Sequence, residues 1–112
     1  MTIKEICDLL GGEVLCAGEG NREIAGAIAG DLLSFIMGTA KEGYLWITIQ
    51  AHLNVAAVAV LKDLPLIILA SGRRAPDDLI ERCNAEKITL LSVPQSVYEV
   101  CAELALHGLK GQ

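Results

Sequence analysis

Polar side chains gather at three points of an otherwise apolar sequence, and each point follows a short apolar run. The three points are Thr48–His52, Ser71–Arg74 and Ser92–Ser96, and a segment with helical features follows each of them. The free N–H groups of a helix start favour an anion, and a guanidinium group pairs with phosphate or carboxylate. These residue types therefore indicate that a small anion binds where the strands end.

Seven residues are candidates for ligand contact on this argument. Gly72 lets the backbone approach a ligand closely, and Arg73 or Arg74 can neutralise its charge. The seven are Gln50, His52, Asn54, Ser71, Gly72, Arg73 and Arg74. The structural alternatives are helix caps for Thr48, Gln50, Ser96 and Asp31, a hydrogen-bonded helix-start residue for His52, and a solvated loop charge for one of the two arginines.

The sequence holds no constellation that is typical of catalysis, such as a nucleophile beside a base, paired carboxylates, a P-loop or HExxH. Gly18 and Gly20 begin a G-x-G pattern, but Glu23 stands where a dinucleotide fingerprint needs its third glycine. The four cysteines have no C-x-x-C spacing and form no paired-ligand spacing with His52 or His107. We therefore expect no enzyme, no metal and no cofactor, and free buried thiols in a reducing compartment.

The length of 112 residues indicates one domain, residues 1–112. Of these residues, 53% are hydrophobic. The mean hydropathy of +0.47 is high for a free monomer, so we expect a partner to cover apolar surface and favour a homodimer. The net charge of −5 argues against a nucleic-acid partner, which requires clustered Lys and Arg. The first twelve residues lack a signal-peptide pattern, and we therefore expect a cytoplasmic protein.

The segment Gly43–Leu61 allows two interpretations. It has no charged side chain and is long enough to span a bilayer. Against this, Gln50, His52 and Asn54 in its middle would be costly in hydrocarbon. We therefore favour a soluble strand followed by a helix, and expect no membrane contact.

The two apolar runs Tyr44–Thr48 and Leu66–Leu69 have strand length, and the helical segment Leu53–Leu61 joins them. Continuous apolar strands joined by a helix indicate a parallel pair that is covered on both faces. The whole chain predicts the order α-β-β-α-β-α-β-α-β-α. This order is typical of an α/β fold with a mostly parallel sheet of about five strands and helices on both faces. The other three strands are predicted at Glu13–Cys16, Glu23–Ala29 and Ile88–Leu91.

Three helix starts have recognisable caps. Thr2 with Glu5 and Ser96 with Glu99 form capping boxes, and Asp31 is predicted to cap the next helix. The buried stripe predicted for that helix is Leu32, Leu33, Ile36 and Ala40.

Four stretches of the sequence resemble the DRTGG domain family, whose fold is similar to the N-terminal domain of HPr kinase/phosphorylase. They are Ala29–Ser34, Trp46–Thr48, Asn54–Leu61 and Ile67–Gly72, and the resemblance extends over Ile24–Leu106. DRTGG domains occur as regulatory modules in CBS-containing inorganic pyrophosphatases and some phosphotransacetylases, and as stand-alone small proteins. Where the family has Asp-Arg-Thr this sequence has Ala51-His52-Leu53, and where the family has Gly-Gly it has Ser71-Gly72.

The resemblance implies a non-catalytic α/β module that dimerises and responds to a small ligand, with adenine nucleotides as the class to test. It carries over Gly30, Asp31, Thr48 and Gly72 as site residues. We therefore expect a stand-alone, homodimeric regulatory module that binds a small anionic ligand at the carboxyl ends of the strands and contacts a partner enzyme or signalling protein. The alternative is a structural interaction or dimerisation module without a small-molecule ligand.

Overall fold

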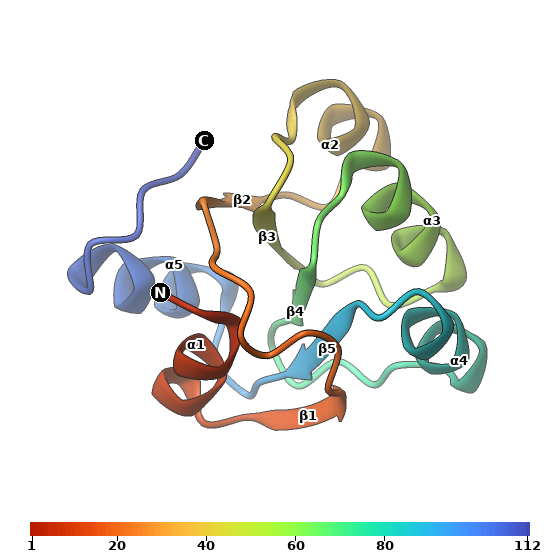
Figure 1. Cartoon of the computed structure of the whole chain (residues 1–112), viewed down its shortest axis with the longest axis horizontal. Coiled ribbons are helices and arrows are strands. Elements are labelled where there is room, and N and C mark those ends of the chain that lie inside the picture. The colour runs from red at the N-terminus through yellow and green to blue at the C-terminus, as the bar shows by residue number, and fades with distance from the viewer.

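Helices and strands alternate along the chain in the computed structural model, which describes residues 1–112 (Figure 1). The elements are α1 (Ile3–Leu10), β1 (Glu13–Cys16), β2 (Gly26–Ala29), α2 (Leu33–Thr39), β3 (Tyr44–Thr48), α3 (Leu53–Lys62), β4 (Leu66–Leu69), α4 (Asp77–Ala85), β5 (Thr89–Ser92) and α5 (Val97–Leu106). The predicted order of elements and the α/β class are confirmed.

The strands form one five-stranded sheet in the order β1-β5-β4-β3-β2. The three pairs β2–β3, β3–β4 and β4–β5 are parallel, and β1 pairs antiparallel with β5. The sheet is therefore mixed but mostly parallel, as predicted. Because β2 to β5 run in the same direction, their carboxyl ends lie at one edge of the sheet.

The central strands β3 and β4 bury side chains on both faces. Trp46 and Ile67 pack in the core formed with α2, α3 and α4, whereas Leu45 and Ile68 pack in the core formed with α1 and α5. Successive residues of a strand point to opposite faces, so an apolar run needs helices on both sides. Figure 1 shows the resulting three layers, with α2, α3 and α4 on one face and α1 and α5 on the other.

The cap predictions have mixed outcomes. Both capping boxes are present, with Thr2 and Ser96 accepting from the N3 backbone. The Asp31 prediction is wrong, because α2 begins after Leu32 and no side chain caps it. Leu32, predicted to be buried, is 66% exposed, whereas Ile36 is fully buried.

Two strand boundaries differ from the prediction for reasons of hydrogen bonding. The segment predicted to begin the second strand at Glu23 pairs with the N-terminus instead, since Ile24 N–H donates to Met1 O over 2.9 Å. The strand itself begins at Gly26. The last strand was predicted to begin at Ile88. The Ile88 N–H instead donates to Cys83 O of α4 over 2.9 Å, and the strand begins at Thr89.

The stretch Gly43–Leu61 divides into β3, a turn and most of α3. None of the helices has the length and apolar character needed to cross a bilayer.

Candidate functional site

The strand-end residues named from the sequence lie at one edge of the sheet, because β2 to β5 are parallel. At this edge they form two groups rather than one. The first group follows β2 and β3, and the second follows β4 and β5. The geometry of each group determines what it can bind.

The first group is tied together by the Asp31 carboxylate. Its Oδ1 accepts from the Thr48 hydroxyl and from the Ile49 N–H, both over 2.9 Å. Gln50 donates from Nε2 to the Asp31 carbonyl over 3.1 Å, and its own N–H donates to Thr48 Oγ1 over 3.1 Å. Thr48 is fully buried. These polar groups therefore hold the end of β3 against the loop after β2.

Neighbouring residues of the first group have different environments. The Gly30 carbonyl accepts from Trp46 Nε1 over 2.8 Å, which satisfies a fully buried indole. His52 is the N-cap residue of α3 but makes no side-chain cap hydrogen bond. His52 and Asn54 are exposed. The predicted capping roles of Thr48 and Gln50 are not observed, since both bond to the Asp31 loop instead.

The second group is built on a tight turn after β4. Arg73 N–H donates to the Ala70 carbonyl over 3.3 Å, and Ser71 and Gly72 both have positive φ, 59° and 66°. A left-handed conformation costs a non-glycine residue roughly 1–2 kcal/mol. Surrounding bonds compensate, because Ser71 N–H donates to Gln95 O over 2.7 Å and Gly72 N–H donates to Val93 O over 2.9 Å.

This turn borders a surface hollow of about 410 Å³. Arg73 and Arg74 line it, both are exposed, and neither takes part in any of the four ion pairs. Ser92 orients the turn by donating from its hydroxyl to the Arg73 carbonyl over 3.2 Å. The remaining lining residues are Glu13, Leu15, Gly72, Ala75, Asp77 and Ile80. Arginine side chains in a hollow of this size can bind a small anion.

Two acidic residues of this hollow were not among the candidates drawn from the sequence. Glu13 lies beside Ser92 because β1 pairs antiparallel with β5, and this pairing has no local sequence signal. Asp77 is in the first turn of α4, where the sequence suggested only a role with the helix dipole. The hollow therefore combines guanidinium and carboxylate groups.

The thiols are not arranged for nucleophilic or metal chemistry. All four cysteines are free, and burial raises the pKa of Cys83 to about 12. Burial also raises the pKa of Cys7, Cys16 and Cys101 above the ordinary thiol value. No three His, Cys, Asp or Glu side chains are grouped to hold a metal ion.

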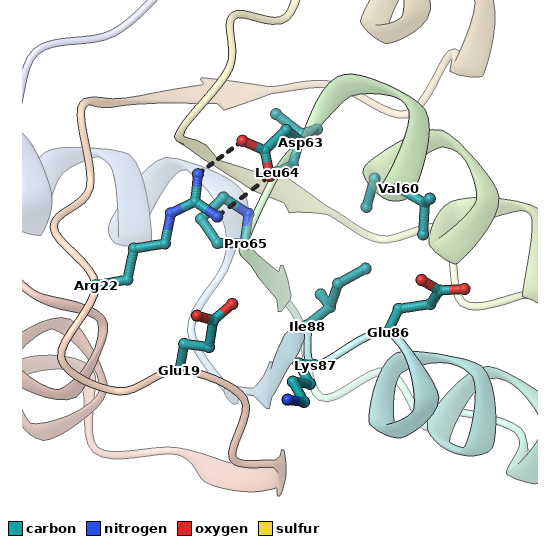
Figure 2. Close-up of a pocket in the computed structure, with 10 residues that line it drawn as sticks. Glu19, Arg22, Val60, Asp63, Leu64, Pro65, Glu86, Lys87 and Ile88 are labelled. Carbon is teal, nitrogen blue, oxygen red and sulfur yellow. Dashed lines mark hydrogen bonds and ion pairs between the residues drawn. The ribbon is translucent and has the colours of Figure 1, made fainter.

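A second polar hollow, of about 170 Å³, lies at the amino ends of β4 and β5, opposite the strand ends described above. Figure 2 shows Arg22 reaching across it to Asp63, with Glu19 and Lys87 nearby. The pair is bidentate, with N–O distances of 2.8 and 3.2 Å. The guanidinium of Arg22 lowers the pKa of Asp63 below its usual value. This ion pair joins the segment before β2 to the end of α3, so it has a structural role.

Fold and site together define a small α/β domain with a polar strand-end edge and no catalytic constellation. The sequence profile of the DRTGG domain matches residues 5–106. The chain belongs to the DRTGG domain family. No curated protein matches the sequence.

A solved structure of similar fold comes from Clostridium perfringens. It contains the CBS and DRTGG domains of the regulatory region of a pyrophosphatase, in complex with the activator diadenosine tetraphosphate. The TM-score is 0.74 at 16% sequence identity, and the match covers 92% of this chain and 45% of that chain. The present chain therefore spans less than half of that regulatory region, and at this identity the likeness shows the fold.

The Asp31–Thr48 contact predicts an energetic coupling. Asp31→Ala and Thr48→Val should each lower the free energy of unfolding by about 1–3 kcal/mol, since each leaves a polar group without its partner. The double variant should lose less than the sum of the two, by about 1 kcal/mol. Urea denaturation of the four proteins measures this coupling. Asp78→Ala combined with Thr48→Val is the control, and strict additivity in the Asp31 cycle would contradict the contact.

The Arg22–Asp63 pair predicts a pH-dependent contribution to stability. Because the folded-state pKa of Asp63 is lowered, the pair should stabilise the fold fully above the ordinary value of 3.8 and lose this effect as the pH falls through the folded-state pKa. Asp63→Asn tolerates the left-handed backbone at φ 52°. Its urea midpoint should lie below wild type at pH 6 and approach it near pH 3. Arg22→Met should abolish the same pH dependence, and a constant difference across this range would contradict the assignment.

Proposed function

We propose that this protein is a non-catalytic regulatory module that binds a small anionic ligand of the adenine nucleotide class. The observation that carries the proposal is the hollow of about 410 Å³ beside the turn after β4, where Arg73 and Arg74 are exposed and unpaired. In parallel α/β sheets, ligands bind outside the carboxyl ends of the strands. Hollows of this volume accommodate molecules of nucleotide size.

The charges of the hollow favour a ligand with both acceptor and donor groups. Arg73 and Arg74 would pair with phosphate oxygens. Glu13 and Asp77 line the same hollow and would accept from an amino group such as that of adenine. Asp77 and Asp78 in the first turn of α4 offset its dipole, so the arginines supply most of the attraction for the anion.

The first strand-end group would contribute differently. Asp31, Thr48 and Gln50 are engaged with one another, so they would position the edge rather than contact the ligand. His52 and Asn54 are exposed at the start of α3, where a ligand longer than a mononucleotide would meet them. The activator of the Clostridium perfringens regulatory region, diadenosine tetraphosphate, is of this longer kind and supports the adenine class.

We further propose a homodimer formed through the α2–α3 side of the molecule. Six of the nine exposed large hydrophobic residues lie between residues 32 and 61, namely Leu32, Phe35, Met37, Leu53, Val60 and Leu61. Figure 1 shows α2 and α3 side by side on the outside of the sheet. A concentration of exposed apolar side chains is typical of a protein interface. The free thiols support a reducing, cytoplasmic environment for this dimer.

The ligand proposal is tested by thermal unfolding against adenosine mono-, di- and triphosphate, diadenosine tetraphosphate and inorganic phosphate. A ligand at ~100 times its dissociation constant should add ~2.7 kcal/mol to the free energy of unfolding, which raises Tm by roughly ten degrees for a domain of this size. Arg73→Ala or Arg74→Ala should reduce this shift by more than half, since each removes one charge-assisted contact.

Lys4→Ala is the matched control, because it removes an exposed positive charge from α1 and should leave the shift unchanged. No shift with any compound would overturn the ligand proposal and favour a structural interaction module. An equal loss of shift in the Lys4 variant would indicate a general charge effect instead of a site.

The dimer proposal is tested by sedimentation equilibrium at micromolar protein. Leu61→Ser should weaken the dimer about tenfold or more, because Leu61 is 71% exposed on the proposed interface. Leu106→Ser is the matched control, since Leu106 is 81% exposed on α5 in the opposite layer. A wild-type monomer at these concentrations would contradict the proposal, as would equal effects of the two substitutions.

A further inference from the structure

The hollow of Arg73 and Arg74 carries opposite charges on separate segments of the chain. The arginines project from the turn after β4, whereas Glu13 is the first residue of β1. β1 is an edge strand, and Glu13 forms its terminal pair with Ser92 of β5. The ends of elements fray at low free-energy cost unless further contacts hold them. The separation between the Glu13 carboxylate and the guanidinium groups therefore depends on what holds the start of β1.

Gln95, in the loop after β5, is bonded to both of these segments. Its side chain donates from Nε2 to Leu10 O over 2.8 Å. Leu10 is the last residue of α1, where backbone carbonyls have no partner within the helix. The Gln95 carbonyl accepts from the N–H of Ser71, in the turn that carries the two arginines, over 2.7 Å. One residue therefore joins the chain that leads into β1 to the turn after β4.

The contact with Gln95 holds the peptide group between Leu10 and Gly11 from both sides. The carbonyl of this peptide group accepts from Gln95 Nε2, and its N–H donates to Cys7 O over 2.9 Å. A peptide group whose donor and acceptor are both bonded keeps one orientation. The chain therefore leaves α1 in a fixed direction.

Two glycines connect this peptide group to Glu13. The second of them, Gly12, lies so close to β5 that a Cβ would collide with the Ser92 carbonyl oxygen. At the other end of β1, the hydroxyl of Thr89 donates to Ala17 O over 2.7 Å. Side chains of the β5 segment therefore hold β1 at both ends, and the Gln95 side chain holds the end that carries Glu13.

We propose that Gln95 is a positioning residue of the proposed ligand site, on which this inference rests, and that its side chain sets the preference of the hollow for a phosphate compound that carries an amino group. Gln95 is not among the lining residues and acts through Glu13. With Glu13 held beside Arg73 and Arg74, one ligand can meet the carboxylate and the guanidinium groups together. An anion without an amino group meets only the arginines and does not depend on the Gln95 side chain.

The alternative role of Gln95 is to cap α1 and nothing more. Its Oε1 is buried and has no partner within the chain. Gln95→Met removes the amide and this unpaired oxygen together and leaves the backbone bond to Ser71 in place, so the variant should fold. A capping role alone predicts a change in stability without a change in ligand preference.

The test compares adenosine triphosphate, inosine triphosphate and inorganic triphosphate by isothermal titration calorimetry on the full chain. Inosine has an oxygen atom where adenosine has its amino group. The wild type should bind adenosine triphosphate about tenfold more tightly than inosine triphosphate, because a hydrogen bond to a carboxylate contributes on this scale. Gln95→Met should abolish this preference and leave the affinity for inorganic triphosphate unchanged.

Hydrogen exchange of the free protein tests the positioning without any ligand. In Gln95→Met the Gly11 amide should exchange about fivefold faster or more, since its peptide group loses one of two hydrogen bonds. The Ser71 amide should stay protected, because it bonds to the backbone carbonyl of residue 95.

Gln112→Met is the matched control. Gln112 also donates from Nε2 to a backbone carbonyl, that of Thr39, over 2.7 Å, and it lies beside β2 at the other edge of the sheet. This variant should keep the wild-type ligand preference and the wild-type exchange of Gly11. Gln95→Glu is a second variant in case Gln95→Met does not fold, because its carboxylate cannot donate to Leu10 O at neutral pH and should abolish the preference as well.

The outcomes separate this role of Gln95 from the proposed function. A wild type that binds none of the three compounds would overturn both. A wild-type preference for adenosine triphosphate that Gln95→Met retains would overturn the role of Gln95 alone, as would an equal loss of affinity for all three compounds. Unchanged exchange of the Gly11 amide in Gln95→Met would also overturn it, since the start of β1 would then be held by other contacts.

Discussion

The structure depends on the complete burial of β3 and β4. These two strands carry apolar side chains toward both faces of the sheet, and Leu45, Trp46, Ile67 and Ile68 are almost inaccessible to solvent. A sheet of this kind is stable only when helices cover both faces. Burial of apolar area is the main favourable term of folding, and backbone hydrogen bonds satisfy the strand interiors. The buried polar side chains, Thr48 and Thr89, are therefore confined to strand ends.

The two halves of the strand-end edge differ in how far their polar groups are satisfied within the protein. After β2 and β3, the Asp31 carboxylate accepts hydrogen bonds from the Thr48 hydroxyl and the Ile49 N–H, so it holds the end of β3. After β4, Arg73 and Arg74 project from a turn whose backbone is bonded but whose charges are not paired. The two bonds hold Asp31 Oδ1 in place, whereas the guanidinium groups of Arg73 and Arg74 form no ion pair within the chain. This difference is the reason why the ligand is proposed for the second half.

The turn after β4 also accounts for a departure from the family pattern. In the sequence resemblance, Ser71-Gly72 stand where DRTGG domains have Gly-Gly. In this chain Ser71 and Gly72 both have positive φ. Glycine suits such positions because it has no Cβ. Ser71 adopts the same conformation because its N–H bonds to Gln95 O and the turn is held on both sides.

The sequence by itself determined the fold class, the element order, both capping boxes and the common edge of the strand ends, because apolar periodicity and local capping chemistry are encoded over a few neighbouring residues. Only the tertiary structure decided that Asp31 bonds to Thr48 instead of capping α2, and that Glu13 lines the hollow of Arg73 and Arg74. It also decided that Lys110 and Gln112 form backbone hydrogen bonds with Ala27. These contacts join residues that are distant in sequence. They arise from which strands become neighbours in the sheet, and no local pattern specifies that choice.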